Sequence, residues 1–186
     1  NDIKSIGMDI NIDSIDLGNQ DFHKVFKIKD IKLNNLISKN QKKIRRLQRK
    51  QARRIILAKK SKIKLGKNFK KTQDKINKIH TKNCNIKVFA LHNLVNQILT
   101  FIKSKNINHI IMENLNVKQM TSRDNVNKTI GKNRSKSMKK NILQISFHMF
   151  KQILTYKCAM NGVYVSLVDP KNTSKSCSKC GNIDNQ

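Results

Sequence analysis

Acidic residues are scarce in this 186-residue chain, which carries 11 Asp and Glu against 40 Lys and Arg, for a formal net charge of +29. Such a surface disfavours a cationic partner and favours a polyanion, of which nucleic acid is the commonest. The sequence also lacks any run of 18 apolar residues and any secretory signal at its start. These absences exclude a membrane-spanning helix and predict a cytoplasmic, nucleoid-associated protein that is not secreted.

Cysteine and aromatic residues are few as well. Of the four cysteines only Cys177 and Cys180 are close in sequence, and without a secretory context they do not indicate a disulfide framework. Aromatic residues make up 5% of the chain, so no platform for stacking single-stranded bases is evident. Hydrophobic residues make up 37%, which is enough for the core of a single domain.

The charge is distributed unevenly along the chain. Residues 1–30 hold four Lys and six Asp, whereas residues 31–186 hold 36 basic and five acidic residues. The stretch 39–82 alone carries 19 Lys or Arg and one acid, Asp74. A codon bias toward Lys, Asn and Ile accounts for part of the Lys excess, but it does not explain this distribution.

Hydrophobic periodicity predicts where the strands lie. Residues 3–12 alternate apolar and polar side chains, which predicts a strand with one buried face. Residues 22–28 predict a second strand, paired with the first across the turn-forming residues 17–20. Short strands are also predicted at residues 109–112 and 163–168. Together with the helices between them, they predict an α/β fold with a mixed sheet.

Helical spacing is typical of residues 31–103. Sparse apolar residues at near-heptad spacing predict an antiparallel helical hairpin with a narrow apolar seam and a basic exterior. Asn40 and Gln51 occupy two positions of the seam, and Gly66 marks the expected bend.

The remaining chain alternates polar and apolar segments. Residues 117–140 are polar and basic, and they predict either a lid over a cleft or a plain loop. Apolar residues then recur at helical spacing from Ile142 to Met160, and Gly162 is expected to end that helix.

The few carboxylates are informative about chemistry. Glu113, the only Glu, directly follows an apolar strand, where a charge is costly unless it is paired or bound to metal. Asp9 lies mid-strand on the face opposite the isoleucines. If the two strands are neighbours, these carboxylates form a hard-oxygen site for Mg²⁺ or Mn²⁺, suited to phosphodiester hydrolysis. The alternative is a solvated Asp9 and a Glu113 that caps a turn or pairs with a lysine. Asp13 and Asp16 are possible auxiliary acids, although acids in turns are usually solvated.

The pair Cys177 and Cys180 has the spacing of a zinc knuckle, in which two thiolates reach one tetrahedral ion. One pair supplies only half of the four ligands that a structural zinc needs. Cys84 and Cys158 stand alone within predicted helices and are expected to be small buried hydrophobic residues.

These blocks together resemble the OrfB/TnpB family of insertion-sequence transposons, RNA-guided DNA endonucleases related to the type V CRISPR effectors. The blocks that carry the resemblance are IGMDINI, HTKNCNIKVFALHNL, IIMENLNV, ILTYKCAMNGVYVSLVDP and NTSKSCSKCG. The resemblance implies a ribonuclease H-like (RuvC-like) core over residues 1–170, with 31–103 as a basic helical insertion. It also implies that Asp9 and Glu113 are catalytic Mg²⁺ ligands, and that residues 171–186 form half of a zinc ribbon.

The family pattern continues beyond what this chain contains. Members carry a second CxxC and a third catalytic acid after the first CxxC, and a further region before the nuclease domain. We therefore expect a piece of a longer protein or a degraded reading frame, with Zn²⁺ bound only if the other ribbon half is supplied. Two functions stay open: a transposon-associated endonuclease that hydrolyses DNA without joining strands, and a catalytically silent, basic nucleic-acid-binding remnant.

The resemblance also gives the basic hairpin a role. Residues 39–82 are expected to contact phosphates of DNA or of a guide RNA, without reading sequence. Five of the seven arginines cluster there, and arginine suits bidentate phosphate contacts. The candidate phosphate ligands are Arg45, Arg46, Arg49, Arg53 and Arg54. The alternative is a solvated helix face.

Overall fold

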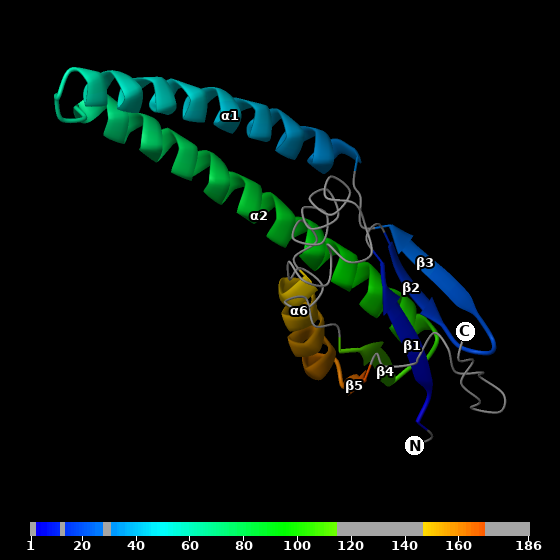
Figure 1. Cartoon of the computed structure of the whole chain (residues 1–186). Helices are drawn as coiled ribbons and strands as arrows, with labels where there is room; N and C mark the ends of the chain where they lie inside the picture. The colour runs from blue at the N-terminus through cyan, green and yellow to red at the C-terminus, as the bar shows by residue number, and fades with distance from the viewer. Residues whose placement is uncertain (1–2, 12–13, 28–30, 115–146, 170–186) are drawn as a thin grey trace, which may run out of the picture. The chain divides into compact units, whose positions relative to one another are not determined.

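The computed structural model describes residues 3–11, 14–27, 31–114 and 147–169. The chain divides into two compact units, Lys29–Asn93 and the combination of Asn1–Ile28 with Leu94–Gln186. The elements in chain order are β1 (Ser5–Ile10), β2 (Ser14–Gly18), β3 (His23–Lys27), α1 (Ile31–Lys60), α2 (Lys67–Ser104), β4 (His109–Glu113), α6 (Phe147–Met160) and β5 (Tyr164–Val168) (Figure 1). Within the described residues, no helix has an apolar stretch long enough to cross a membrane.

The unit made of Asn1–Ile28 and Leu94–Gln186 contains a five-stranded mixed sheet, in the order β3-β2-β1-β4-β5. The chain-adjacent strands β1, β2 and β3 pair antiparallel, whereas β1 pairs with β4 and β4 with β5 in parallel. The predicted mixed α/β sheet is confirmed. The predicted pairing of residues 3–12 with 22–28 is wrong, because β2 lies between those two strands. Leu17 and Gly18 belong to β2, and residues 19–22 connect β2 to β3.

One face of the sheet is buried under helices. The alternation of Ile6 and Met8 in β1 repeats in β2 and β4, so the apolar side chains of these strands share a face. Residues from the end of α2 and from α6, among them Val95, Ile98 and Leu154, complete the core. The opposite face, with Gly7 and Asp9, therefore remains available for a site.

The three described helices end in the same way, with a left-handed residue that turns the chain. In α6, the N–H of Val163 donates to the carbonyl of Cys158 at 2.9 Å, and the N–H of Gly162 to that of Ala159 at 3.2 Å. Gly162 has φ of 69°, which confirms the predicted helix end. Asn106 takes the same position after α2 with φ of 54°. After α1 it is Lys62, with φ of 52°. The connection between α1 and α2 covers residues 61–66 and includes Gly66, where the bend was predicted.

The unit Lys29–Asn93 is the predicted antiparallel hairpin of α1 with the first part of α2. Its seam includes polar pairs: Asn40 Nδ2 donates to Asn83 Oδ1 at 2.7 Å, and Gln51 Nε2 donates to Gln73 Oε1 at 3.0 Å. Asn83 and Gln51 are buried. Each pair forms in only one alignment of the two helices, so these amides fix the register, as the two polar seam positions indicated.

We expect the Asn40→Leu variant to destabilise the hairpin by about 1–3 kcal/mol, because it leaves the buried Asn83 amide without its partner. Adding Asn83→Leu should restore most of that loss, since both polar groups are then removed. Urea unfolding followed by helical circular dichroism measures both variants, with the exposed Gln48→Leu as the matched control. A single variant as stable as the wild type would show that this pair does not hold the register.

Candidate functional site

Asp9 and Glu113 lie on adjacent central strands. Strands β1 and β4 pair in parallel from Ser5 with His109 to Met8 with Met112, so the next step of this register brings Asp9 level with Glu113. Both side chains follow a buried methionine and therefore project from the face opposite the core. The expectation that the two strands are neighbours is confirmed. Metal binding by these carboxylates stays a prediction.

An open cavity of about 420 Å³ lies over this face of the sheet. The floor of the cavity has no side chains at Gly7 and Gly18, which pair directly across β1 and β2. A Cβ on Gly7 would stand 3.4 Å from the carbonyl oxygen of Gly18, in van der Waals contact, so a side chain there would fill part of the floor. The cavity is lined by Gly7, Met8, Asp9, Asp16, Gly18, His23, Ile111, Glu113 and Val168.

Asp16 is a third carboxylate in this cavity. The sequence left it open between an auxiliary acid and a solvated turn acid, and the structure places it within strand β2. It lies in β2 directly opposite Asp9 in the antiparallel register. Its Oδ2 accepts a hydrogen bond from Asn11 Nδ2 at 2.8 Å. Its Oδ1 is buried and has no hydrogen-bond partner among the described residues. The available signal was the alternation of Ser14, Ile15, Asp16 and Leu17, which places the carboxylate on the polar face of a strand.

Two histidines of the sheet differ in their environment. The ring of His109 lies 3.0 Å from Ser5 Oγ through Nδ1 and 2.7 Å from Ser166 Oγ through Nε2. These contacts tie β1, β4 and β5 together and use both ring nitrogens, so His109 is structural. His23 is exposed and lines the cavity at β3. Among the described residues, no group of three or more His, Cys, Asp and Glu side chains is placed to hold one metal ion.

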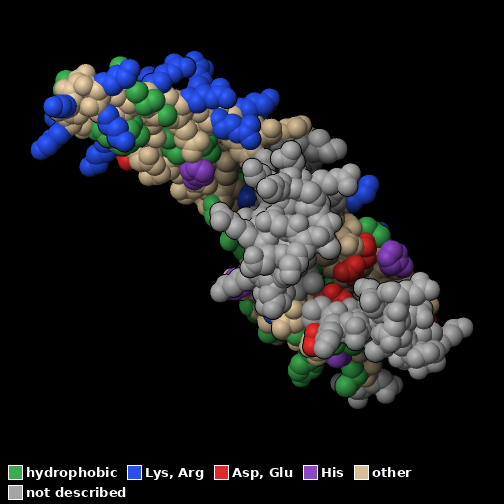
Figure 2. Space-filling model, viewed as in Figure 1, with side chains coloured by type: hydrophobic (Ala, Val, Ile, Leu, Met, Phe, Trp, Pro, Cys, Tyr) green, Lys and Arg blue, Asp and Glu red, His purple; other side chains and the backbone are tan. Residues whose placement is uncertain are grey.

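Basic side chains gather over the hairpin (Figure 2). At 100° per residue, the exposed Arg45, Arg46, Arg49 and Arg53 fall within one arc of about 100° on α1, away from the seam. We call these four residues the arginine row. Arg54 differs, because its Nη1 donates at 2.7 Å both to the carbonyl oxygen of Asn68 and to Thr72 Oγ1. Its guanidinium therefore joins α1 to α2, a role that composition did not indicate.

The cysteines add no metal site within the described residues. Cys177 and Cys180 lie outside them, so the predicted zinc knuckle stays a prediction. Cys158 is fully buried in α6, and burial raises its pKa to about 11, so the thiol stays protonated and packs as a small apolar group. Cys84 was expected to be buried as well, but it is exposed on α2.

Similarity to known proteins covers most of the chain. The family model of the Cas12f1-like TNB domain matches residues 147–186. The putative RNA-guided DNA endonuclease InsQ of Escherichia coli (strain K12) is 33% identical over 150 residues, which are 79% of this chain and 34% of InsQ. The chain thus spans about a third of the length of that relative.

Two solved structures are similar in fold. A complex of Cas12f1 with sgRNA and target DNA matches 97% of this chain and 39% of its own, with 20% identity and a TM-score of 0.55. A CRISPR-Cas12f ternary complex matches 100% of this chain and 33% of its own, with 20% identity and a TM-score of 0.58. At this identity the likeness establishes the mixed α/β fold alone.

Proposed function

We propose, from the premise that this is a TnpB/Cas12f-like chain, that it carries the metal-dependent nuclease site of an RNA-guided DNA endonuclease. The observation that carries the proposal is the placement of Asp9 and Glu113 on neighbouring parallel strands, lining one open cavity. The sheet is then the core of a ribonuclease H-like (RuvC-like) nuclease, and hydrolysis of a DNA phosphodiester is its reaction.

The residues present fit a hard divalent cation. The described part of the cavity offers carboxylate oxygens from three strands and no thiolate, which suits Mg²⁺ or Mn²⁺ over softer metals. The buried Oδ1 of Asp16, without a hydrogen-bond partner among the described residues, supports the same interpretation, because an uncompensated carboxylate oxygen is costly. Asp9 and Glu113 would hold the ion and Asp16 would add negative charge beside it. When bound, such an ion activates water and stabilises the leaving oxygen.

The carboxylates also determine when a nucleic-acid backbone can approach the sheet. Asp9, Asp16 and Glu113 together repel a phosphodiester unless cations offset their charge. The glycine floor at Gly7 and Gly18 leaves room for a polymer backbone to lie close to the sheet. The open face thus admits DNA only together with the cation.

Partners follow from the relatives and from the charge. InsQ is named as an RNA-guided DNA endonuclease, and the matched Cas12f1 structure contains sgRNA and target DNA. We propose DNA and a guide RNA as the partners of this chain, with the arginine row contacting phosphates. Cys177 and Cys180 would contribute two of the four ligands of a structural zinc, which needs two further ligands to close its shell.

The test combines metal binding with turnover. Electron paramagnetic resonance should detect Mn²⁺ bound to the purified chain, displaced by Mg²⁺ and not by K⁺. Together with its guide RNA, the chain should cleave DNA in Mg²⁺ and stop on addition of EDTA. Cleavage that persists in EDTA would overturn the proposal. Bound Mn²⁺ without cleavage would instead favour a silent nucleic-acid-binding remnant.

We expect the Asp16→Asn variant to weaken Mn²⁺ binding about 5- to 30-fold without unfolding the chain. The reason is a loss of about 1–2 kcal/mol of Coulomb attraction between the ion and a carboxylate on the neighbouring strand. Titration followed by electron paramagnetic resonance measures the change, with Asp21→Asn, an exposed acid outside the cavity, as the control. Equal affinities for the two variants would remove Asp16 from the site.

A further inference from the structure

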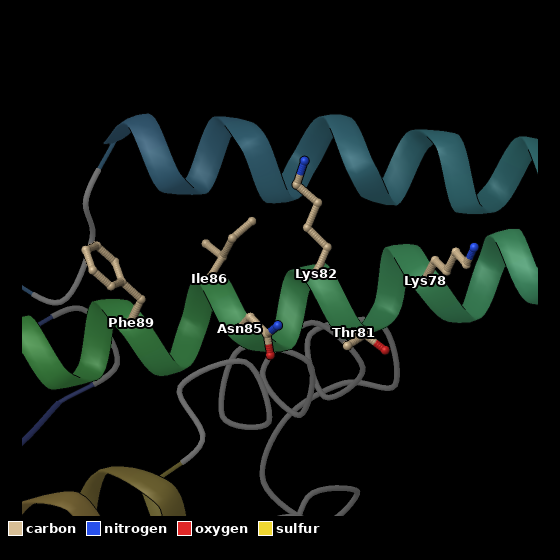
Figure 3. Close-up of a pocket in the computed structure, with 6 residues that line it drawn as sticks. All are labelled: Lys78, Thr81, Lys82, Asn85, Ile86 and Phe89. Carbon is tan, nitrogen blue, oxygen red and sulfur yellow. The ribbon is translucent and has the colours of Figure 1, made fainter.

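A second open groove, of about 460 Å³, lies along α2 in the hairpin unit. The side chains of α2 that line it are spaced three and four residues apart, so they form one stripe of the helix. Figure 3 shows the stripe from Lys78 at one end to Phe89 at the other. The lining residues are Lys78, Thr81, Lys82, Asn85, Ile86 and Phe89.

Phe89 is unusual in its exposure. Its side chain is 60% exposed, and it is the one mostly exposed phenylalanine among the described residues. The hairpin seam uses other α2 positions, among them Ile76 and Asn83, which are buried. Phe89 therefore does not hold the helices together, and its ring offers a flat apolar face to a ligand. An aromatic face of this kind stacks an unpaired base at about 1–3 kcal/mol.

The charge of the groove complements a phosphate strand. Lys78 and Lys82 are exposed and lie about one turn apart, a rise of about 6 Å along the helix. Among the residues that the structure describes, no acid lines the groove, and the single acid of residues 39–82, Asp74, lies outside it. Single-strand binding needs phosphate contacts and a stacking face. The two lysines supply the first and the exposed ring supplies the second.

The uncharged polar residues favour RNA over DNA. Thr81 Oγ1 donates its proton to the carbonyl oxygen of Asn77 at 3.2 Å, so toward the groove it can only accept. Asn85 carries both an amide donor and a carbonyl acceptor. A phosphate can only accept hydrogen bonds and deoxyribose has no 2′-hydroxyl, so neither can donate to Thr81 Oγ1. The ribose 2′-OH can donate to it.

We propose that this groove binds one unpaired ribonucleotide of an RNA strand. Phe89 stacks on its base, Lys78 and Lys82 contact the flanking phosphates, and Thr81 and Asn85 lie beside the ribose. The inference rests on the proposed binding of RNA by this chain, and it is independent of hydrolysis by the carboxylates.

The test uses a single-stranded RNA with 2-aminopurine at one internal position, added to the full chain. Stacking on Phe89 should change the fluorescence of the probe, and Phe89→Ala should abolish the change and weaken binding about 5- to 150-fold. The matched control is Leu57→Ala, which removes an equally exposed apolar side chain, 63% exposed, from α1. Circular dichroism verifies that both variants remain helical.

Further arms separate the contributions. Changing Lys78 and Lys82 to Gln should lower the salt slope of RNA binding by up to about 1.4, because each phosphate contact on a single strand contributes about 0.7. DNA of the same sequence should bind more weakly than RNA, and Thr81→Val with Asn85→Ala should remove that preference. RNA that binds Phe89→Ala as well as the wild type would overturn this inference alone. A wild-type chain that binds no RNA would overturn it together with the proposed RNA partner.

Discussion

Replacing Asp9 with Asn, or Glu113 with Gln, is expected to reduce Mg²⁺-dependent DNA cleavage by about a hundredfold or more. Each substitution keeps the size of the side chain but removes the charge that would hold the ion, and the ion contributes several kcal/mol of charge stabilisation in the transition state. Asp9 is exposed and Glu113 is half-buried at a strand end, so neither change should disturb the core. Initial rates measured with saturating guide RNA and DNA give the effect.

The same variants should also lose bound Mn²⁺, which separates a metal site from a general effect on folding. In EDTA, where neither the variant nor the wild type holds an ion, DNA affinity should stay the same or rise, because the variant has one negative charge less in the cavity. Asp74→Asn, an exposed acid on the hairpin, is the matched control and should behave as the wild type. Cleavage at the wild-type rate in either cavity variant would show that the two carboxylates are not the metal ligands.

How far the sequence predicts this site depends on strand order. The alternation around Asp9 and the position of Glu113 after an apolar strand are local, and both are visible in the sequence. Asp16 was named only as a possible auxiliary acid because strand β2 was not predicted: it has only five residues, with an Asp and a Gly among them, and such a segment resembles a turn. Its position opposite Asp9 depends on a register that only the paired strands define.

The hairpin shows the same division between local and tertiary information. The seam positions of Asn40 and Gln51 follow from periodicity, which depends on helix geometry alone. The hydrogen-bond partners of Arg54 do not follow from periodicity. They depend on how α1 is aligned against Asn68 and Thr72 of α2. Composition therefore grouped five arginines that the structure separates into an exposed row of four and one that holds the hairpin.

That separation leads to a prediction about nucleic-acid affinity. Changing the arginine row, Arg45, Arg46, Arg49 and Arg53, to Gln should lower the salt slope of duplex DNA binding by up to about 3.6. Each arginine that contacts one phosphate contributes about 0.9 to the slope through released counterions. At low salt the affinity should fall by several orders of magnitude. Filter binding or fluorescence anisotropy over 50–200 mM salt measures both quantities.

Arg54→Gln is the matched control for this set, because it removes the same charge from a neighbouring position of α1. Its guanidinium donates to Asn68 and Thr72, so we expect the variant to lower the free energy of unfolding of the hairpin by about 1–3 kcal/mol. Its salt slope should change by less than that of any single variant of the row. If Arg54→Gln lowers the slope as much as Arg49→Gln, phosphate contact depends on total charge alone and not on the exposed face. Equal slopes for the fourfold variant and the wild type would place the nucleic-acid surface elsewhere on the chain.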